Sequence, residues 1–269
     1  MADNDIVDFE RRFGGIGRLY GRAVLERYAN AHVCVIGVGG VGSWAAEALA
    51  RSAIGEITLI DLDNVAESNV NRQVHALDGE FGRPKVDVMK QRIRVINPEC
   101  TVHCVEEFIA ESNLDQLIES RFDYVMDCID AYRTKAALIA HCRRRKIPVI
   151  TAGGAGGQVD PLKIALADLS RSEQDPLLSK TRKLLRQEYG FSRNLKRRFA
   201  VPCVYSREQT TLPAFATEAC GTDGAATGLT GLNCAGFGSS VAVTATFGLV
   251  AVSHVLGKIA DSEEVSKEC

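Results

Sequence analysis

The stretch AHVCVIGVGGVGSWAAEALARSA (31–53) determines the fold class of this 269-residue chain. Its first part, 31–37, is an unbroken run of apolar and β-branched residues, which is typical of a strand buried on both faces. The segment 39–53 continues from the glycine-rich turn, and its apolar residues, Val41 and Trp44 among them, recur at helical spacing. The stretch therefore predicts a strand, a tight turn and a helix, the first half of a βαβ unit.

The alternation of strands and helices continues along the chain. Further strands are predicted at 56–63, 101–107, 122–130 and 147–153, and further helices at 85–97 and 132–146. This order indicates an α/β fold, with a doubly wound, mostly parallel Rossmann-like sheet. Residues 157–170 instead predict two antiparallel strands joined at Asp160-Pro161, and hence an antiparallel C-terminal extension.

The composition is that of an ordinary globular protein, with 46% hydrophobic and 25% charged residues. It excludes disordered, collagen-like and disulfide-scaffold classes. The net charge of −2 means that any nucleic-acid site must be a local basic patch. Nine cysteines without a CxxC spacing, and an acidic start that resembles no signal peptide, predict a cytoplasmic protein with reduced thiols.

An apolar segment lies near the C-terminus, since 224–257 contains no Asp, Glu, Lys or Arg. A hydropathy criterion selects 237–257 as a membrane span, because about 20 apolar residues cross a bilayer. Serine, threonine and histidine dilute this segment, however, and Gly248 interrupts it. We therefore expect a buried or dimer-interface helix, and membrane association is not favoured.

The glycine-rich turn has the GxGxxG pattern of a nucleotide site. Its glycines are Gly37, Gly39, Gly40 and Gly42. They permit a tight turn close to a phosphate, at the positive end of the following helix. Asp61 follows the second strand, where an acid accepts hydrogen bonds from ribose hydroxyls. A nucleotide site is therefore favoured over a purely structural glycine turn.

Charged residues at the same predicted sheet edge indicate which nucleotide binds. Arg72 and Lys85 suit a triphosphate better than a nicotinamide cofactor, because cations neutralise a leaving pyrophosphate. Asp127 and Asp130 end the strand at 122–130 and offer oxygen ligands for Mg²⁺. The alternative for Asp130 is capping of the next helix, and the two roles can coexist.

Four motifs in this order resemble the ubiquitin-activating-like adenylyltransferases, which include those of molybdopterin and thiamine biosynthesis. They are GVGGVGS (37–43), DLDNVAESNVNRQ (61–73), GRPKV (82–86) and DCID (127–130). The resemblance is strong over 10–157 and weaker beyond. It implies that ATP and Mg²⁺ are used and that a carboxylate attacks ATP to give an acyl-adenylate and pyrophosphate.

The resemblance also implies roles for individual residues. Asp61 would bind ribose with Asp63 beside it, Asn69, Arg72 and Lys85 would hold the phosphates, Gln73 would complete the loop, and Asp130 would coordinate Mg²⁺. Arg72, Lys85 and Asp130 are thus the expected catalytic residues. The chain divides into an N-terminal segment (1–30), an ATP-binding Rossmann-like domain (31–157) and a C-terminal extension (158–269) that completes the same domain.

The sequence departs from this family in two ways. Many relatives carry two CxxC pairs for a structural zinc, and this chain has none, so no structural zinc is expected. The family also places an arginine finger, supplied across a dimer, near the N-terminus. Gly15 occupies that position here, which leaves Arg12 or Arg18 as a substitute.

Three further segments resemble one branch, the tRNA threonylcarbamoyladenosine dehydratases. They are RRFGGIGRLYG (11–21), DPLLSKTRKLLRQ (175–187) and VPCVYSRE (201–208). The branch implies a homodimer that adenylylates a tRNA-bound carboxylate and closes it to a cyclic form. Basic runs at 143–146 and 180–198 suit tRNA phosphates, although a solvated helix face explains each run alone.

Two alternative functions remain. The first is an activating enzyme for a ubiquitin-like or sulfur-carrier protein, and the second is a non-catalytic nucleotide-binding scaffold in a sulfur-acceptor complex. A cysteine desulfurase or a sulfur-acceptor protein is a further candidate partner. A nucleophilic thiol would come from Cys203, Cys220 or Cys234, but a buried, unreactive cysteine is the commoner case.

Overall fold

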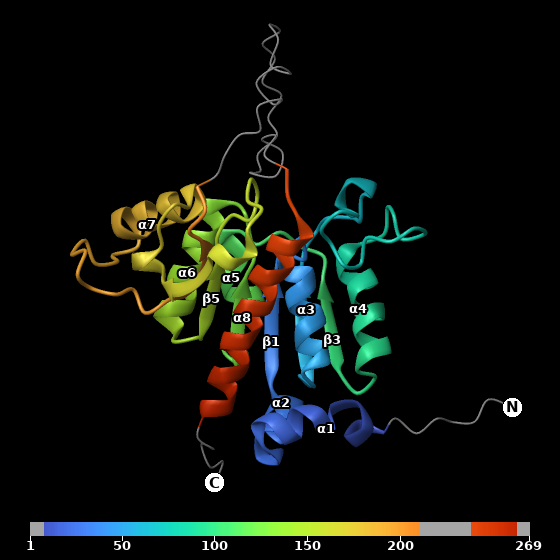
Figure 1. The fold of residues 1–269 in the computed structure, drawn as a ribbon. Helices are drawn as coiled ribbons and strands as arrows, with labels where there is room; N and C mark the ends of the chain where they lie inside the picture. The colour runs from blue at the N-terminus through green and yellow to red at the C-terminus, as the bar shows by residue number, and fades with distance from the viewer. Residues whose placement is uncertain (1–7, 210–237, 263–269) are drawn as a thin grey trace, which may run out of the picture.

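The structure, a computed structural model, describes residues 8–209 and 238–262, and these form a seven-stranded sheet of order β3-β2-β1-β4-β5-β7-β6 (Figure 1). The strands are β1 (His32–Ile36), β2 (Glu56–Ile60), β3 (Thr101–Val105), β4 (Tyr124–Asp127), β5 (Val149–Ala152), β6 (Ile164–Asp168) and β7 (Pro202–Ser206). All neighbouring pairs are parallel except β6 and β7. The predicted α/β fold with a mostly parallel sheet and an antiparallel C-terminal part is confirmed, whereas the division into domains stays a prediction.

The described residues form eight α-helices, and most of these cover the two faces of the sheet. They are α1 (Phe9–Tyr20), α2 (Arg22–Asn30), α3 (Gly42–Arg51), α4 (Lys85–Ile96), α5 (Leu114–Leu117), α6 (Tyr132–Arg145), α7 (Pro176–Glu188) and α8 (Val241–Asp261). Helices α3, α4 and α8 pack in one core, and α5, α6 and α7 contribute to a second core on the other face. In Figure 1, α1 and α2 lie below the sheet, at the end where the strands begin.

Strand β1 shows why the apolar run is unbroken. Val33 and Val35 belong to the core of α3, α4 and α8, whereas Cys34 and Ile36 belong to the core of α5 and α6. Successive side chains of a strand point to opposite faces, and here both faces are covered. Every residue of β1 is therefore buried.

The strand order determines where a ligand binds. Strand β1 lies between β2 and β4, so the chain leaves β1 and β4 toward opposite edges of the sheet. Ligands of open α/β sheets bind at the carboxyl ends of the strands at this point of reversal. Gly37 follows β1, Asp61 follows β2, and Cys128 follows β4, so the sequence motifs all meet at the carboxyl ends of these strands.

Helix α8 covers the sheet and packs along α3 (Figure 1). It is long and apolar enough to cross a membrane, with half of its most apolar window buried in the protein. Gly248 is a point of close approach to α3, since a Cβ atom there would lie 2.7 Å from the carbonyl oxygen of Val41. The half-buried helix is consistent with the prediction of a packing helix, and Gly248 allows its contact with α3.

The predicted antiparallel strand pair at 157–170 is wrong. One strand, β6, occupies the second half, and a 3-10 turn (Pro161–Lys163) precedes it. Asp160 caps this turn by accepting a hydrogen bond from the amide of Leu162 at 3.0 Å, and proline suits the first position of a helical turn. The antiparallel partner of β6 is β7, whose distance along the chain hides it from local patterns.

Helix α7, which lies between these strands, was not predicted. Its start has a clear local cause, since Asp175 accepts a hydrogen bond from the amide of Leu178 at 2.9 Å and Pro176 occupies the first turn. An N-cap aspartate followed by proline is a standard helix start. The many basic residues of this segment hid its apolar face, which buries Leu177, Leu178 and Leu185.

Candidate functional site

The glycine-rich turn between β1 and α3 is held by close backbone contacts. Gly37 has a φ of +85°, which favours glycine. A Cβ atom on Gly42 would lie 1.8 Å from the carbonyl oxygen of Gly37, so no side chain fits there. Gly39 faces Gln73 and Gly40 faces Arg72. The turn thus presents bare backbone at the start of α3, as a phosphate site requires.

Asp61 joins the end of β2 to this turn. Its carboxylate accepts hydrogen bonds from the amide of Val38 at 2.6 Å and from the amide of Asp63 at 2.8 Å. Burial raises the pKa of Asp61, although nearby Lys85 and the two amide donors oppose this effect. Each carboxylate oxygen keeps a second lone pair, so Asp61 can still accept bonds from ribose hydroxyls.

Lys85 is brought to the same edge as the first residue of α4. Its Nζ lies 2.8 Å from Oδ2 of Asp63, and its side chain is 7% exposed. The amide of Lys85 also donates to the carbonyl of Asp63 at 3.0 Å. The segment after β2 therefore holds a nearly buried ammonium group beside Asp61, as the motif spacing indicated.

The segment 66–73 places the remaining candidate residues. Asn69 supports its turn, since Oδ1 accepts a hydrogen bond from the amide of Ala66 at 3.1 Å. Trp44 of α3 donates to the carbonyl of Arg72 at 3.0 Å, which holds Arg72 over the glycine turn. Within the described residues, Nε of Arg72 and Oε1 of Gln73 are buried without a hydrogen-bond partner. An unpaired buried guanidinium nitrogen and a bare backbone turn fit a polyanionic ligand.

The two aspartates at the C-terminal end of β4, Asp127 and Asp130, have different environments. Oδ2 of Asp127 lies 2.8 Å from Nζ of Lys135 and 2.7 Å from Oγ1 of Thr151, and Oδ1 accepts from the amide of Ile129 at 3.1 Å. The structure therefore removes Asp127 from the candidate metal ligands. Asp130 is exposed, and Ala131 rather than Asp130 occupies the N-cap position of α6, so the alternative of a capping role is wrong.

Comparison with known proteins identifies the family. The model of the ThiF family matches residues 15–268. The chain belongs to the ThiF family. It is 51% identical over 255 residues to the tRNA threonylcarbamoyladenosine dehydratase of Haemophilus influenzae, covering 94% of this chain and 95% of that protein. The enzyme of the same name from Escherichia coli is also 51% identical, over 93% of this chain and 94% of that protein.

Solved structures of the Escherichia coli enzyme are also similar to this chain. The crystal structure of the Escherichia coli tRNA N6-threonylcarbamoyladenosine dehydratase in complex with ATP matches with a TM-score of 0.83 and 49% identity, covering 93% of this chain and 94% of that one. A complex of that enzyme with AMP matches with a TM-score of 0.82. The resemblance to adenylyltransferases, and to this branch of the ThiF family in particular, is confirmed.

In this ThiF-family chain Arg12, one of the two arginine-finger candidates, lies far from the glycine turn, and Arg18 belongs to the same helix, α1. Arg12 donates to the carbonyl oxygens of Val95 and Ile96 at 3.1 and 2.9 Å, at the C-terminal end of α4. Lys85 begins the same helix at the nucleotide edge, and a helix of 12 residues is about 18 Å long. Within one chain, Arg12 therefore does not reach the candidate nucleotide site.

The basic segment 180–198 of this ThiF-family chain divides into two groups. Arg182 contacts the hydroxyl of Ser172, and Arg186 stacks on the ring of Phe199 at 5.0 Å, so both support the local fold. The other members are exposed, although Nζ of Lys180 also lies 5.8 Å from the ring centroid of Tyr132. They are Lys180, Lys183, Arg193, Lys196, Arg197 and Arg198.

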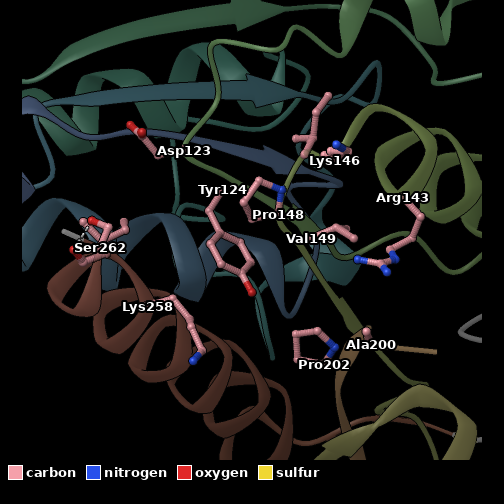
Figure 2. A pocket seen from close by; sticks show the side chains of 12 residues that line it. Asp123, Tyr124, Arg143, Lys146, Pro148, Val149, Ala200, Pro202, Lys258 and Ser262 are labelled. Carbon is pink, nitrogen blue, oxygen red and sulfur yellow. Dashed lines mark hydrogen bonds between the residues drawn. The ribbon is translucent and has the colours of Figure 1, made fainter. Parts of the chain in front are cut away.

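The second basic run, 143–146, is exposed at the C-terminal end of α6. Arg143 and Lys146, together with Lys258 of α8, line a cavity of about 640 Å³ (Figure 2). Pro148 and Val149 also line it, and they mark the point where β5 begins. This run therefore lies at the end of the sheet where the strands begin, opposite the glycine turn.

Cys203 is unsuited to act as a nucleophile. It is fully buried in β7, and burial raises its pKa well above the ordinary value of a thiol. Cys220 and Cys234 lie outside the described residues. The sequence-based expectation of an unreactive thiol is thus supported at position 203.

His75 is a residue of this site that the sequence analysis missed. It is 1% exposed, and within the described residues neither ring nitrogen has a hydrogen-bond partner. Burial, with Lys85 and Arg92 nearby, lowers its pKa to about 4. Its place in NRQVH (71–75), close to the predicted phosphate residue Arg72 and the predicted loop residue Gln73, was the available signal.

The lowered pKa of His75 predicts a pH-dependent stability. The unfolded chain binds a proton at this residue below about pH 6.5, whereas the folded chain does so near pH 4. Stability is therefore retained above pH 6.5 and lost as the pH falls toward 4, by up to about 3 kcal/mol from this residue. Urea unfolding at several pH values measures the loss, which should be smaller in His75→Gln. Equal losses of stability in the unmodified chain and in His75→Gln would show that His75 does not cause the pH dependence.

Proposed function

We propose that this chain is an ATP-dependent tRNA threonylcarbamoyladenosine dehydratase. The proposal is supported by the full-length relation to two enzymes of that name. The observation that carries it is the convergence of Arg72, Lys85 and Asp61 on the glycine turn. Such a site concentrates positive charge where the phosphates of ATP would lie.

The proposed reaction has two steps. The carboxylate of N6-threonylcarbamoyladenosine attacks the α-phosphorus of ATP, and pyrophosphate leaves. A nitrogen of the same substrate then attacks the activated acyl carbon and releases AMP, so the net change is loss of water from the nucleoside. This ring closure requires no enzyme thiol, in agreement with the burial of Cys203. Mass spectrometry of tRNA nucleosides after incubation with protein and ATP tests the function directly.

The site residues have separate roles in this proposal. Lys85 and Arg72 neutralise the charge of the phosphates, and Asp61 binds ribose. Gln73 directs its amide nitrogen toward Gly39 of the glycine turn, and its carbonyl oxygen has no hydrogen-bond partner among the described residues. Asp63 orients Lys85 through their ion pair. Asn69 acts indirectly, by holding the turn that carries Arg72.

Asp130 is the proposed Mg²⁺ ligand. Its carboxylate is exposed beside the end of β4, whereas that of Asp127 is already paired. When bound, Mg²⁺ supplies charge neutralisation at the leaving phosphates. We expect Asp130→Ala to lower turnover by at least about tenfold, with a smaller effect on the Kd for ATP. Turnover and equilibrium ATP binding measure the two effects, and normal turnover with an unchanged Mg²⁺ dependence would exclude this role.

The exposed cations of 180–198 are the proposed tRNA contacts on this chain. We expect Arg197→Glu/Arg198→Glu to weaken tRNA binding and to leave ATP binding unchanged. The slope of log K against log salt should become shallower by about 0.7–0.9 for each phosphate that the variant no longer neutralises. Filter binding at several salt concentrations measures the slope. Arg94→Glu, an exposed cation on α4, is the matched control, and equal slopes in both variants would argue against this surface.

The remaining features of the proposal are a cytoplasmic location and a homodimer. A second copy would supply the arginine finger that one chain cannot place at its own site. Both arginines are exposed, but Arg12 donates hydrogen bonds to the carbonyls of Val95 and Ile96 of α4, so Arg18 suits this role better. Pyrophosphate exchange that depends on tRNA would support the dehydratase. Exchange that depends on a carrier protein would favour the alternative with a cysteine desulfurase or sulfur-acceptor partner.

A further inference from the structure

The end of the sheet where the strands begin, opposite the glycine turn, carries a second cluster of polar side chains. His32 begins β1, Glu56 begins β2, and His103 lies within β3. Parallel pairing of these three strands brings the side chains together. Nδ1 of His32 lies 3.2 Å and Nε2 of His103 lies 2.7 Å from Oε1 of Glu56. All three atoms lie within 4.8 Å of one another.

The donor atoms of this cluster suit a transition metal. Two imidazole nitrogens and one carboxylate oxygen are a known ligand set for Zn²⁺ with one position left open. Two such ligands around one tetrahedral zinc ion are separated by roughly 3.3 Å, since each lies about 2.0–2.1 Å from the metal. The 3.2 Å separation between His32 and Glu56 is close to this value. Mg²⁺ and Ca²⁺ prefer oxygen ligands and fit less well.

His32 is already oriented for such a role. Its Nε2 lies 2.8 Å from Oγ1 of Thr58, and Phe122 packs edge-on against the ring with centroids 4.8 Å apart. Metal-binding histidines commonly use their second ring nitrogen in a hydrogen bond of this kind, which leaves the first nitrogen for the metal. The side chain of His32 is 5% exposed, whereas those of Glu56 and His103 are 32% and 40% exposed, so an ion can enter from solvent.

We propose that His32, Glu56 and His103 form a binding site for a divalent transition metal ion, with Zn²⁺ as the preferred ion. The site joins the first three strands of the sheet at the end away from the nucleotide. Arg121 competes with a metal ion for Glu56, because Nη1 of Arg121 lies 3.2 Å from Oε1 of Glu56. The side chain of Arg121 is half exposed and also pairs with Glu119, so it can leave Glu56 when an ion binds.

Metal titration of the full chain tests the proposal. The protein is first treated with a chelator and is then titrated with Co²⁺ and, separately, with Zn²⁺ while the Tm is measured. We expect visible Co²⁺ absorption without a thiolate charge-transfer band, and a Tm that rises with Zn²⁺. Glu56→Gln and His103→Ala should lose both responses. His254→Gln, which removes a histidine outside the cluster, should keep them.

Two further variants separate metal binding from general loss of structure. Thr58→Val should weaken metal binding by roughly 10–100-fold, because it removes the hydrogen bond that orients His32. Arg121→Gln should bind metal more tightly than the unmodified chain, because it removes the competing cation. The proposal is overturned if His103→Ala binds as much metal as the unmodified chain, if no metal binds, or if the Co²⁺ spectrum shows thiolate ligands.

Discussion

Replacing Lys135 with methionine is expected to lower the free energy of unfolding by about 3–5 kcal/mol. The Lys135 side chain is fully buried, and its Nζ lies 2.8 Å from Oδ2 of Asp127 and 3.0 Å from Oγ1 of Thr151. Methionine keeps most of the volume but leaves a buried carboxylate without its positive partner. Urea unfolding measures the change through the midpoint at constant m-value.

The charge can be separated from the loss of packing. Lys135→Met/Asp127→Asn removes both charges and should recover part of the lost stability, because an amide is less costly to bury than an unpaired carboxylate. Lys183→Met makes the same change at an exposed position of α7 and should stay within about 0.5 kcal/mol. If Lys135→Met resembled Lys183→Met, the buried ion pair would contribute little to stability.

Replacing Lys85 with methionine is expected to lower kcat/KM for adenylate formation by about 10²–10³-fold. The ammonium group is nearly buried beside Asp61 and is held by Asp63 at 2.8 Å. In the proposed reaction negative charge develops on the leaving pyrophosphate, so a cation fixed at this point would stabilise the transition state more than bound ATP. Single-turnover release of pyrophosphate in the presence of tRNA measures the effect.

Controls distinguish this role from a structural one. Methionine retains the apolar stem of Lys85, so the unfolding midpoint should change little, and Lys90→Met on the same helix should leave turnover nearly unchanged. If KM for ATP rose while kcat stayed constant, Lys85 would contribute to ground-state binding alone. That result would contradict the catalytic assignment without affecting the fold.

The elements predicted best are those whose signal is local. The run of apolar residues at 31–37 and the helical spacing after it correspond to β1 and α3 within a few residues. The strand pair β6 and β7 was missed, because more than thirty residues separate the paired segments. Pairing between segments so far apart is a tertiary contact, and no local pattern contains that information.

The sequence by itself determined at which end of the sheet the nucleotide site lies. In a parallel sheet every strand end points the same way, so residues that follow β1, β2 and β4 must meet there. The tertiary structure alone decided what each charged side chain does once it arrives. The residue types of DCID leave both aspartates as candidate ligands, and only the family resemblance singled out Asp130. In the structure, Lys135 from α6 and Thr151 from β5 contact Asp127 and leave Asp130 exposed to solvent. Burial and pairing arise from segments distant in the chain, and they determine which carboxylate is free to bind a ligand.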